Sequence, residues 1–304
     1  METFKLGFAP TRRFVFSKED ALKYKNLIRE KIENFNLGIE IIDLEGINEE
    51  GLLYNRSDEH SIIKRFKDTE VDALFFPHCN FGTEDMVARV AKAIGKPVLL
   101  WGPRDEAPLE DGMRLRDTQC GLFATGKVLR RFNVKFTYIT NCRVDDPIFE
   151  RGFKNFVAAA NVVKEFRNLR IMQISTRPSD FWSVICNEGE LLETFGIQIY
   201  PVTLDELKRA TLKVERKDSP ELLEAIAYIK ENLDWSLVTE QDVKRIAALK
   251  VAMKHMAEGT RSTAIAIQCW SSLQEIVGIM PCLANAILTD EQIPVTCETD
   301  IHGA

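Results

Sequence analysis

Two patterns of apolar and polar residues alternate in the first half of the chain. Short apolar runs are separated by longer stretches in which apolar residues recur every three or four positions, the spacing of an amphipathic helix. The apolar runs predict strands at residues 4–10, 38–44, 71–77, 96–102 and 134–140. The stretches between them predict helices at 17–35, 60–69, 83–95 and 118–132. Strands and helices that alternate with short loops predict a parallel sheet covered on both faces.

The alternation resumes after a long helix predicted at 147–168. Strand-like runs follow at 169–175, 196–202, 262–269 and 293–298. Helical stretches are predicted at 188–195, 203–210, 219–233, 239–260 and 273–290. We therefore predict an α/β fold class with two consecutive Rossmann-like domains, residues 1–150 and 151–304, each a mainly parallel sheet flanked by helices.

Composition narrows the class of protein. The chain has 304 residues, a formal net charge of −6 and 28% charged residues. An acidic chain is a poor partner for nucleic acid, because phosphate binding needs a basic surface. No apolar run approaches the roughly 20 residues that span a bilayer, and the first residues lack the pattern of a signal peptide. Seven cysteines without CxxC spacing indicate reduced thiols, so we predict a cytoplasmic protein with no nucleic-acid or membrane partner.

Ligands of parallel α/β sheets bind beyond the carboxyl ends of the strands, which directs attention to four loops. The first carries Arg12 and Arg13, which could hold an oxygen-rich ligand or form a solvated basic turn. The second carries His78, Cys79 and Asn80 ahead of a helix start, where a ligand site and ordinary turn residues are equally good interpretations. His78 and Cys79 alone are too few ligands for a zinc site.

The third loop follows the apolar run 262–267 and contains Gln268 and Trp270. A glutamine can both donate to and accept from hydroxyl groups, and an indole offers a sugar a flat apolar face. The alternative is that both are cap and core residues. A long charged loop at 104–117 is either functional or a surface loop whose charges pair with one another.

The fourth loop, CETDIHGA, has the strongest signal. Glu298, Asp300 and His302 would share one side if the preceding strand continued. Carboxylates with an imidazole suit Mn²⁺, Mg²⁺ or a related divalent ion. Such ions take about six ligands, so the predicted metal site is incomplete within this chain.

The run WSSLQEIVGIMPCLANAILTDEQIPVTCETDIHGA resembles the central segment of the L-fucose isomerase and L-arabinose isomerase superfamily. WGPRDEA and DTQCGLFATGKVLRRFNVKFTYI resemble the first domain of L-fucose isomerase-like proteins. FFPHCNFGTEDM resembles the loop that those enzymes place at the mouth of a neighbouring subunit's active site. The resemblance covers most of the chain. It implies a sugar substrate, Mn²⁺ or another divalent metal as cofactor, and a homo-oligomer with sites shared between subunits.

The resemblance also implies roles for single residues. Glu298 matches the glutamate that binds the metal and transfers the proton, and Gln268 matches a glutamine that contacts the substrate. Arg12 or Arg13 lies near an arginine that contacts the sugar, and Asp300 is expected to be a weak ligand or to lie behind Glu298. Cys79 stands where L-fucose isomerases have a tryptophan, so the sugar is not defined by the resemblance.

The function expected from the resemblance is metal-dependent aldose–ketose isomerisation through an ene-diol. The resemblance implies a second carboxylate ligand further along the sequence after the glutamate, and a histidine ligand in a following C-terminal domain. We therefore expect this chain to carry the first two domains only and to be inactive alone. Two alternatives stay open. One is a non-catalytic sugar-binding or regulatory homologue, and the other is an enzyme of the same superfamily that acts on a modified or phosphorylated sugar.

Overall fold

The computed structural model describes residues 3–304. These residues fall into two compact units, and the division lies between Lys164 and Glu165. The predicted boundary at residue 150 lies inside helix α5 (Pro147–Arg167), most of which belongs to the first unit. The reason is packing: Phe149 and Phe153 of α5 are fully buried in a core of the first unit. None of the helices in the described part of the chain is long and apolar enough to cross a membrane.

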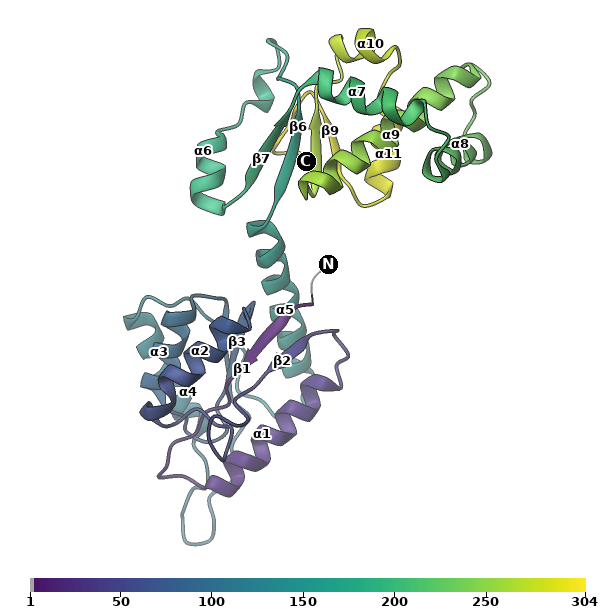
Figure 1. Cartoon of the computed structure of the whole chain (residues 1–304). Helices are drawn as coiled ribbons and strands as arrows, with labels where there is room; N and C mark the ends of the chain where they lie inside the picture. The colour runs from purple at the N-terminus through teal and green to yellow at the C-terminus, as the bar shows by residue number, and fades with distance from the viewer. Residues whose placement is uncertain (1–2) are drawn as a thin grey trace. The chain divides into compact units, whose positions relative to one another are not determined.

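The first unit contains a five-stranded sheet in the order β2-β1-β3-β4-β5, and every pairing is parallel. Its strands are β1 (Lys5–Phe8), β2 (Glu40–Ile42), β3 (Ala73–Pro77), β4 (Val98–Trp101) and β5 (Thr137–Tyr138). Its other helices are α1 (Lys18–Glu33), a 3₁₀ turn (Arg56–Asp58), α2 (Glu59–Asp68), α3 (Glu84–Ile94) and α4 (Thr118–Arg131). In Figure 1, α2, α3 and α4 gather on one side of this sheet and α1 lies on the other.

Two apolar cores lie on opposite faces of the first sheet. Phe8 and Phe75 pack with α1 and α5 on one face, whereas Leu74 and Phe76 pack with α2, α3 and α4 on the other. Alternate residues of β3 thus enter different cores, which explains why this strand is apolar at every position. The Ser17 side chain caps α1, and Gly95 ends α3 in the left-handed conformation.

The second unit contains a four-stranded parallel sheet in the order β7-β6-β8-β9. Its strands are β6 (Arg170–Ile174), β7 (Gln198–Val202), β8 (Ala264–Ile267) and β9 (Val295–Cys297). Its long helices are α7 (Leu204–Glu215), α8 (Pro220–Asn232) and α9 (Glu240–Thr260). Its short elements are a 3₁₀ turn (Trp182–Val184), α6 (Glu188–Glu190), a π-helical turn (Leu191–Phe195), α10 (Ser272–Val277) and α11 (Cys282–Asp290).

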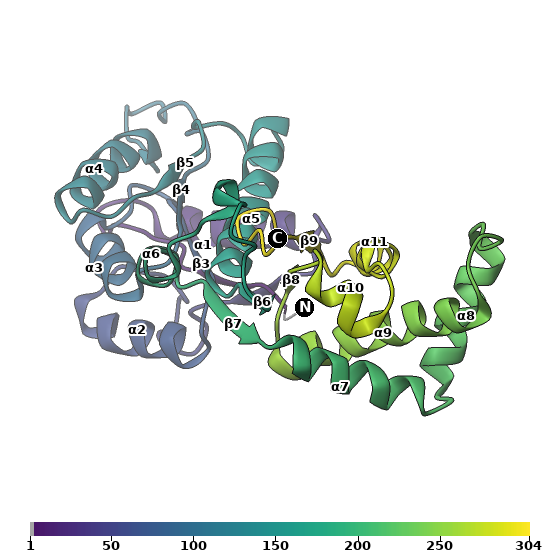
Figure 2. The ribbon, with the colours of Figure 1, turned by 90° about the horizontal axis from the view of Figure 1, so that it is seen from above.

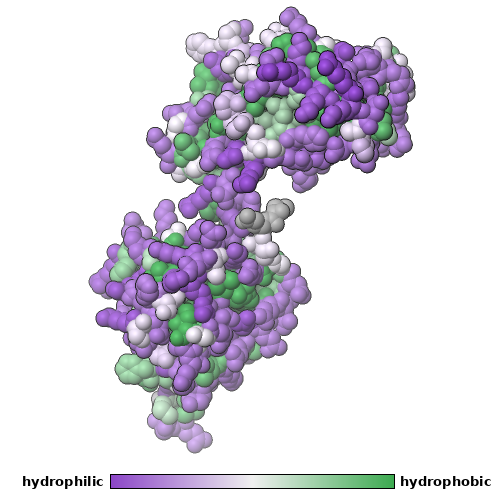
Figure 3. Space-filling view, viewed as in Figure 1, coloured by the Kyte–Doolittle hydropathy of each residue, from purple (hydrophilic) through white to green (hydrophobic). Residues whose placement is uncertain are grey.

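The predicted α/β class with two Rossmann-like domains is confirmed, and two predicted helices differ in detail. The helix predicted at 273–290 is split into α10 and α11, because Gly278 adopts a φ of +76° and Pro281 follows. The helix predicted at 188–195 becomes one turn of α6 and a π-helical turn. Figure 2 views the same ribbon from above, with α7, α8, α9 and α11 grouped on one side of the second sheet. The visible surface is mostly hydrophilic, with small separate apolar patches (Figure 3).

Candidate functional site

The carboxyl ends of β6, β8 and β9 bring several predicted residues of the second unit together. The order β7-β6-β8-β9 reverses between β6 and β8, which is where doubly wound sheets bind ligands. Ser175, just beyond β6, donates from Oγ to Oε1 of Gln268 at 2.6 Å, and the Gln268 backbone N–H donates to Ile174 O at 3.0 Å. Gln268 is therefore held at this edge, and its amide nitrogen has no partner within residues 3–304.

The strand β9 ends at Cys297 and does not continue through the last loop. Glu298 and Thr299 have φ values of +54° and +55°, in the left-handed region. The expectation that Glu298, Asp300 and His302 share one side of a strand is therefore wrong. Left-handed backbone at residues other than glycine costs about 1–3 kcal/mol per residue and is concentrated at functional sites. Here the turn is held by the Thr299 N–H, which donates to Ile267 O of β8 at 3.2 Å.

The turn buries the Glu298 carboxylate. Glu298 is only 6% exposed, and its Oε1 accepts a hydrogen bond from Cys269 Sγ at 2.7 Å. Its Oε2 is buried and has no hydrogen-bond partner in the described part of the chain. A buried carboxylate oxygen without a donor is costly, and a cation would satisfy it. Glu298 therefore fits the role of a metal ligand that its position in the sequence predicts.

Asp300 and His302 do not join Glu298 in a ligand set. Asp300 Oδ1 accepts from the Gly303 N–H at 3.1 Å, which stabilises the terminal turn, and His302 is exposed. Among residues 3–304 there is no group of three or more histidine, cysteine, aspartate or glutamate side chains suited to a metal ion. The described residues can thus supply one buried carboxylate to a metal.

Trp270 supplies an aromatic surface near this edge. Its side chain is 58% exposed, and Phe181 meets its ring edge-to-face with 5.5 Å between the ring centroids. The neighbouring loop fixes Phe181, because the Arg177 guanidinium donates to the Phe181 carbonyl at 3.3 Å. An indole that is braced on one side and open on the other suits the apolar face of a sugar.

The predicted residues of the first unit also meet at one edge, beyond β1 and β3. These two strands flank the point where the order β2-β1-β3-β4-β5 reverses. Arg12 is buried: it forms two hydrogen bonds with the Glu50 carboxylate, of which Nη2 to Oε1 measures 2.8 Å, and it lies 4.1 Å from the Tyr54 ring centroid. The Arg12 side chain is therefore already paired with groups inside the protein.

His78, Cys79 and Asn80 are all fully buried. His78 Nε2 lies 2.8 Å from Thr125 Oγ1, and burial lowers the pKa of His78 to about 4, so the imidazole is neutral at pH 7. Burial also raises the pKa of Cys79 to about 12. Asn80 Oδ1 accepts from the Arg13 N–H at 2.8 Å, so this side chain ties the β1 and β3 loops together. The three side chains therefore support this edge of the sheet from the interior of the unit and do not face solvent.

Arg13 is the predicted residue of this edge that faces outward. Its side chain is 31% exposed, its guanidinium lies 4.3 Å from the Phe81 ring centroid, and its Nε donates to Gly82 O at 3.0 Å. The next residue, Phe14, is 81% exposed. An arginine and a phenylalanine side by side on the surface suit contact with a partner or ligand outside this unit.

The charged loop at 104–117 mostly satisfies its own charges. Arg116 is buried, packs on the Tyr24 ring at 3.6 Å and donates from Nε to Glu106 Oε2 at 3.0 Å. Burial, followed by the hydrogen bond to Glu106, raises the pKa of Tyr24 to about 12. Asp105 accepts from the Thr118 N–H at 3.0 Å and so caps α4. A cavity of about 720 Å³ lies against this loop.

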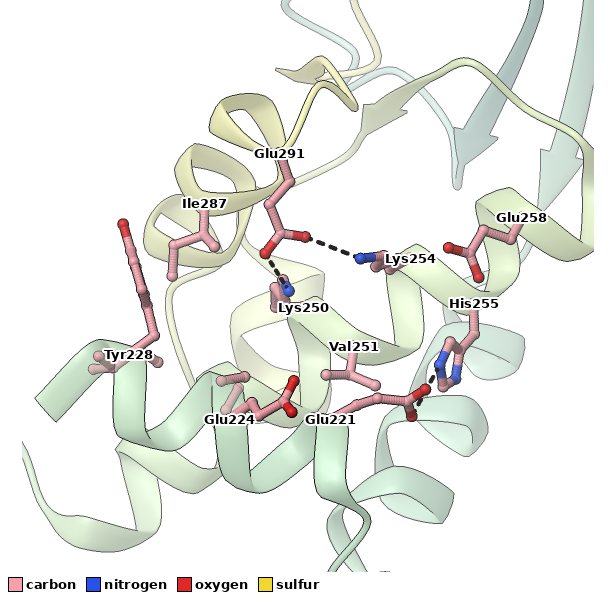
Figure 4. Close-up of a pocket in the computed structure, with 13 residues that line it drawn as sticks. Glu221, Glu224, Tyr228, Lys250, Val251, Lys254, His255, Glu258, Ile287 and Glu291 are labelled. Carbon is pink, nitrogen blue, oxygen red and sulfur yellow. Dashed lines mark hydrogen bonds and ion pairs between the residues drawn. The ribbon is translucent and has the colours of Figure 1, made fainter. Parts of the chain in front are cut away.

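Sequence reasoning missed the groups that hold the site residues. Ser175, Cys269 and Glu50 each bond a predicted residue across the fold, and no local pattern marks them. Another cavity, of about 500 Å³, lies between α8, α9 and α11 (Figure 4). In it the Glu291 carboxylate pairs with both Lys250 and Lys254, at 2.6 and 3.3 Å, so the two ammonium groups share one countercharge.

Comparison with known proteins identifies relatives of the chain. Residues 7–167 match the sequence model of the fucose/sulfoquinovose isomerase N-terminal domain. The sulfoquinovose isomerase of Alkalicoccus urumqiensis is 26% identical over 236 residues, which cover 77% of this chain and 51% of the relative. That of Priestia megaterium is 21% identical over 239 residues, which cover 78% of this chain and 52% of the relative. The chain spans about half the length of these relatives.

Among solved structures, an ABC transporter periplasmic solute binding protein from Actinobacillus succinogenes with bound D-allose is 11% identical. The match covers 96% of this chain and 84% of that protein, with a TM-score of 0.24. At this score the match supports no conclusion about fold or ligand.

Proposed function

Because the chain belongs to the fucose/sulfoquinovose isomerase family, we propose that it is part of a metal-dependent aldose–ketose isomerase. The observation that carries the proposal is the Glu298 carboxylate, which is 6% exposed and has an unpartnered Oε2 among the described residues. A carboxylate in this state is suited both to ligate a cation and to exchange a proton with a substrate. It also stands in a strained turn beyond a parallel strand, where such sheets bind ligands.

The residues present define what each group contributes. Glu298 would hold Mn²⁺ or another divalent ion, with Asp300 behind it, and the ion would polarise adjacent oxygens of the open-chain sugar. Glu298 moves the proton between C1 and C2 through an ene-diol. Gln268 donates its free amide hydrogens to a sugar hydroxyl, and Trp270 packs against an apolar face of the sugar.

The substrate we propose is a sugar, and a sulfonated one first among the candidates, because the relatives are sulfoquinovose isomerases. The protein would act as a cytoplasmic homo-oligomer in which the surface at Arg13 contributes to a neighbour's site. The Arg13 side chain is 31% exposed, and the next residue, Phe14, is 81% exposed. His78, Cys79 and Asn80 would position this surface from behind.

The test is conversion of sulfoquinovose and L-fucose to their ketoses, with Mn²⁺ added, by the protein purified from its native cells. Glu298→Gln keeps the size of the side chain and is expected to lower turnover at least 100-fold. Asp300→Asn, which keeps the turn, serves as the matched control and should cost less than 10-fold. The 304-residue chain is assayed in parallel and is expected to be inactive. The proposal fails if the native protein converts no aldose, or if the glutamine variant retains full activity.

A non-catalytic sugar-binding role is the second candidate. The exposed Trp270, with Phe181 against its edge and Gln268 nearby in sequence, can bind a sugar without a metal. Saturation-transfer NMR with the same sugars separates the two functions. Binding that Trp270→Ala abolishes, without any turnover by the native protein, would favour the non-catalytic role.

A further inference from the structure

Two cysteines flank the Glu298 carboxylate at the carboxyl ends of β8 and β9. In the parallel register Ile267 of β8 pairs with Cys297 of β9, and Cys269 follows Ile267 by two residues. Cys269 Sγ donates to Glu298 Oε1 at 2.7 Å, and Glu298 is the residue after Cys297. The two thiols and the carboxylate therefore form one cluster, although 28 positions separate the cysteines in the sequence.

The two thiols differ in access. Cys297 is exposed, whereas Cys269 is buried and only 5% exposed. Burial, and after it the adjacent Glu298 carboxylate and Cys297 thiol, raise the pKa of Cys269. Asn285 Nδ2 lies 3.7 Å from Cys297 Sγ. An exposed thiol that oxidants can reach, next to a sheltered second thiol, is the arrangement of attacking and resolving cysteines in redox-sensitive proteins.

We propose that Cys269 and Cys297 are a redox-active pair, which hydrogen peroxide converts into a disulfide beside Glu298. In the first step Cys297 sulfur takes one oxygen from peroxide and becomes a sulfenic acid, and the other oxygen leaves as water. In the second step Cys269 sulfur attacks Cys297 sulfur, and the Cys269 hydrogen leaves with the sulfenic hydroxyl as a second water. Two thiols are oxidised and one peroxide is reduced.

The two cysteines lie at the ends of neighbouring strands. The register pairs Ile267 with Cys297 at the roughly 4.8 Å spacing of adjacent strands, and Cys269 lies two residues further along the chain. Cys269 lies beyond the end of β8, and Cys297 is exposed, so its side chain can rotate without disturbing the core. Closing the bond removes the Cys269 hydrogen that Glu298 Oε1 accepts. Both carboxylate oxygens then lack a donor among the described residues.

The chemistry of the two thiols is independent of the proposed function. The 304-residue chain is treated with one equivalent of hydrogen peroxide, and the remaining thiols are counted by alkylation of the denatured protein. We expect two of the seven thiols to be lost, the protein mass to fall by the two hydrogens, and a peptide that joins residues 269 and 297. Dithiothreitol should restore both thiols.

Three variants make the result specific. Cys297→Ser and Cys269→Ser should each prevent the linked peptide, whereas Cys282→Ser, which removes another exposed cysteine, should leave it unchanged. If the buried Cys269 variant does not fold, the exposed Cys297 variant decides the test alone. Seven intact thiols, a linked peptide that persists in Cys297→Ser, or Cys297 oxidised to sulfinic acid beside a free Cys269 would each overturn the proposal. A disulfide found in a chain without isomerase activity would support the pair and leave only the proposed function in question.

Discussion

Replacing Glu50 with glutamine is expected to destabilise the first unit strongly. Glu50 and Arg12 are both buried, with side chains only 7% and 9% exposed, and two hydrogen bonds join them. The substitution leaves the Arg12 guanidinium buried without its countercharge. Lys18 also approaches Glu50, at 3.3 Å, but it is 49% exposed and contributes little.

The expected loss of stability follows from the buried Arg12 charge that remains after the substitution. Removing one partner of a buried ion pair costs about 3–5 kcal/mol, because the other charge stays desolvated. Glutamine keeps one acceptor oxygen for Arg12, which places the expected loss at about 3 kcal/mol. This corresponds to a rise on the order of 100-fold in the population of the opened state.

Hydrogen exchange followed by mass spectrometry measures this free energy separately in each unit. Peptides that cover β1 and the loop around residue 50 should exchange faster in Glu50→Gln, while peptides from β6 and β8 should not change. Glu49→Gln removes the same charge from an exposed neighbour and is the matched control. A Glu50→Gln effect as small as that of Glu49→Gln would refute the reasoning.

The pH dependence gives a second test of the same pair. Burial raises the pKa of Glu50, but the hydrogen bonds and charge of Arg12, and then those of Lys18, outweigh it and hold the pKa below 4.5. A lowered pKa in the folded state means that the stabilisation is complete above pH 4.5 and is lost as the pH falls through the folded value. The free-energy difference between wild type and Glu50→Gln should thus be constant near neutrality and shrink in acid.

Three further predictions concern the same unit. Burial lowers the pKa of His78 to about 4, so stability is lost as the pH falls from 6.5 towards 4. In His78→Gln the melting temperature should vary less with pH over this range. An NMR titration midpoint of His78 near 6.5 would contradict the prediction. Gly121→Ala should prevent stable folding, since a Cβ there would lie 1.7 Å from Phe81 O. In the control Gly126→Ala the Cβ meets only a side chain, at 3.4 Å. That variant should leave the free energy of unfolding, measured in urea, unchanged or raise it by up to about 1 kcal/mol. Phe149→Ala should cost about 3–5 kcal/mol and reduce the near-ultraviolet circular dichroism, because this ring is fully buried and stacks on an indole at 3.9 Å; a loss below 1 kcal/mol would refute it.

The fold was predictable because its determinants are local or periodic. Buried strands such as β3 and β8 read as apolar runs, and amphipathic helices read as three-to-four spacing, since each element must cover a sheet. Caps such as Ser17 and Gly95 act within a few residues of themselves. The π-helical turn after α6 and the break between α10 and α11 were not predicted, because both stretches keep a helical pattern.

The chemical positions of the candidate site were also apparent from the sequence, since they follow the strands. Arg12, His78, Gln268 and Glu298 all lie just beyond a strand of a parallel sheet, where the topology collects ligand contacts. The sequence therefore determined which side chains lie at each edge, because they belong to the residues that follow the strands.

Only the tertiary structure decided what those side chains do there. Arg12 is neutralised by Glu50, 38 residues away, and Glu298 is bonded to Cys269, 29 residues away. Such pairs depend on strand register and on which loops meet, and neither leaves a spacing in the sequence. The left-handed turn that buries Glu298 is likewise held by a hydrogen bond to another strand. The local sequence pattern is compatible with a continued strand, but contacts across the sheet determine the turn.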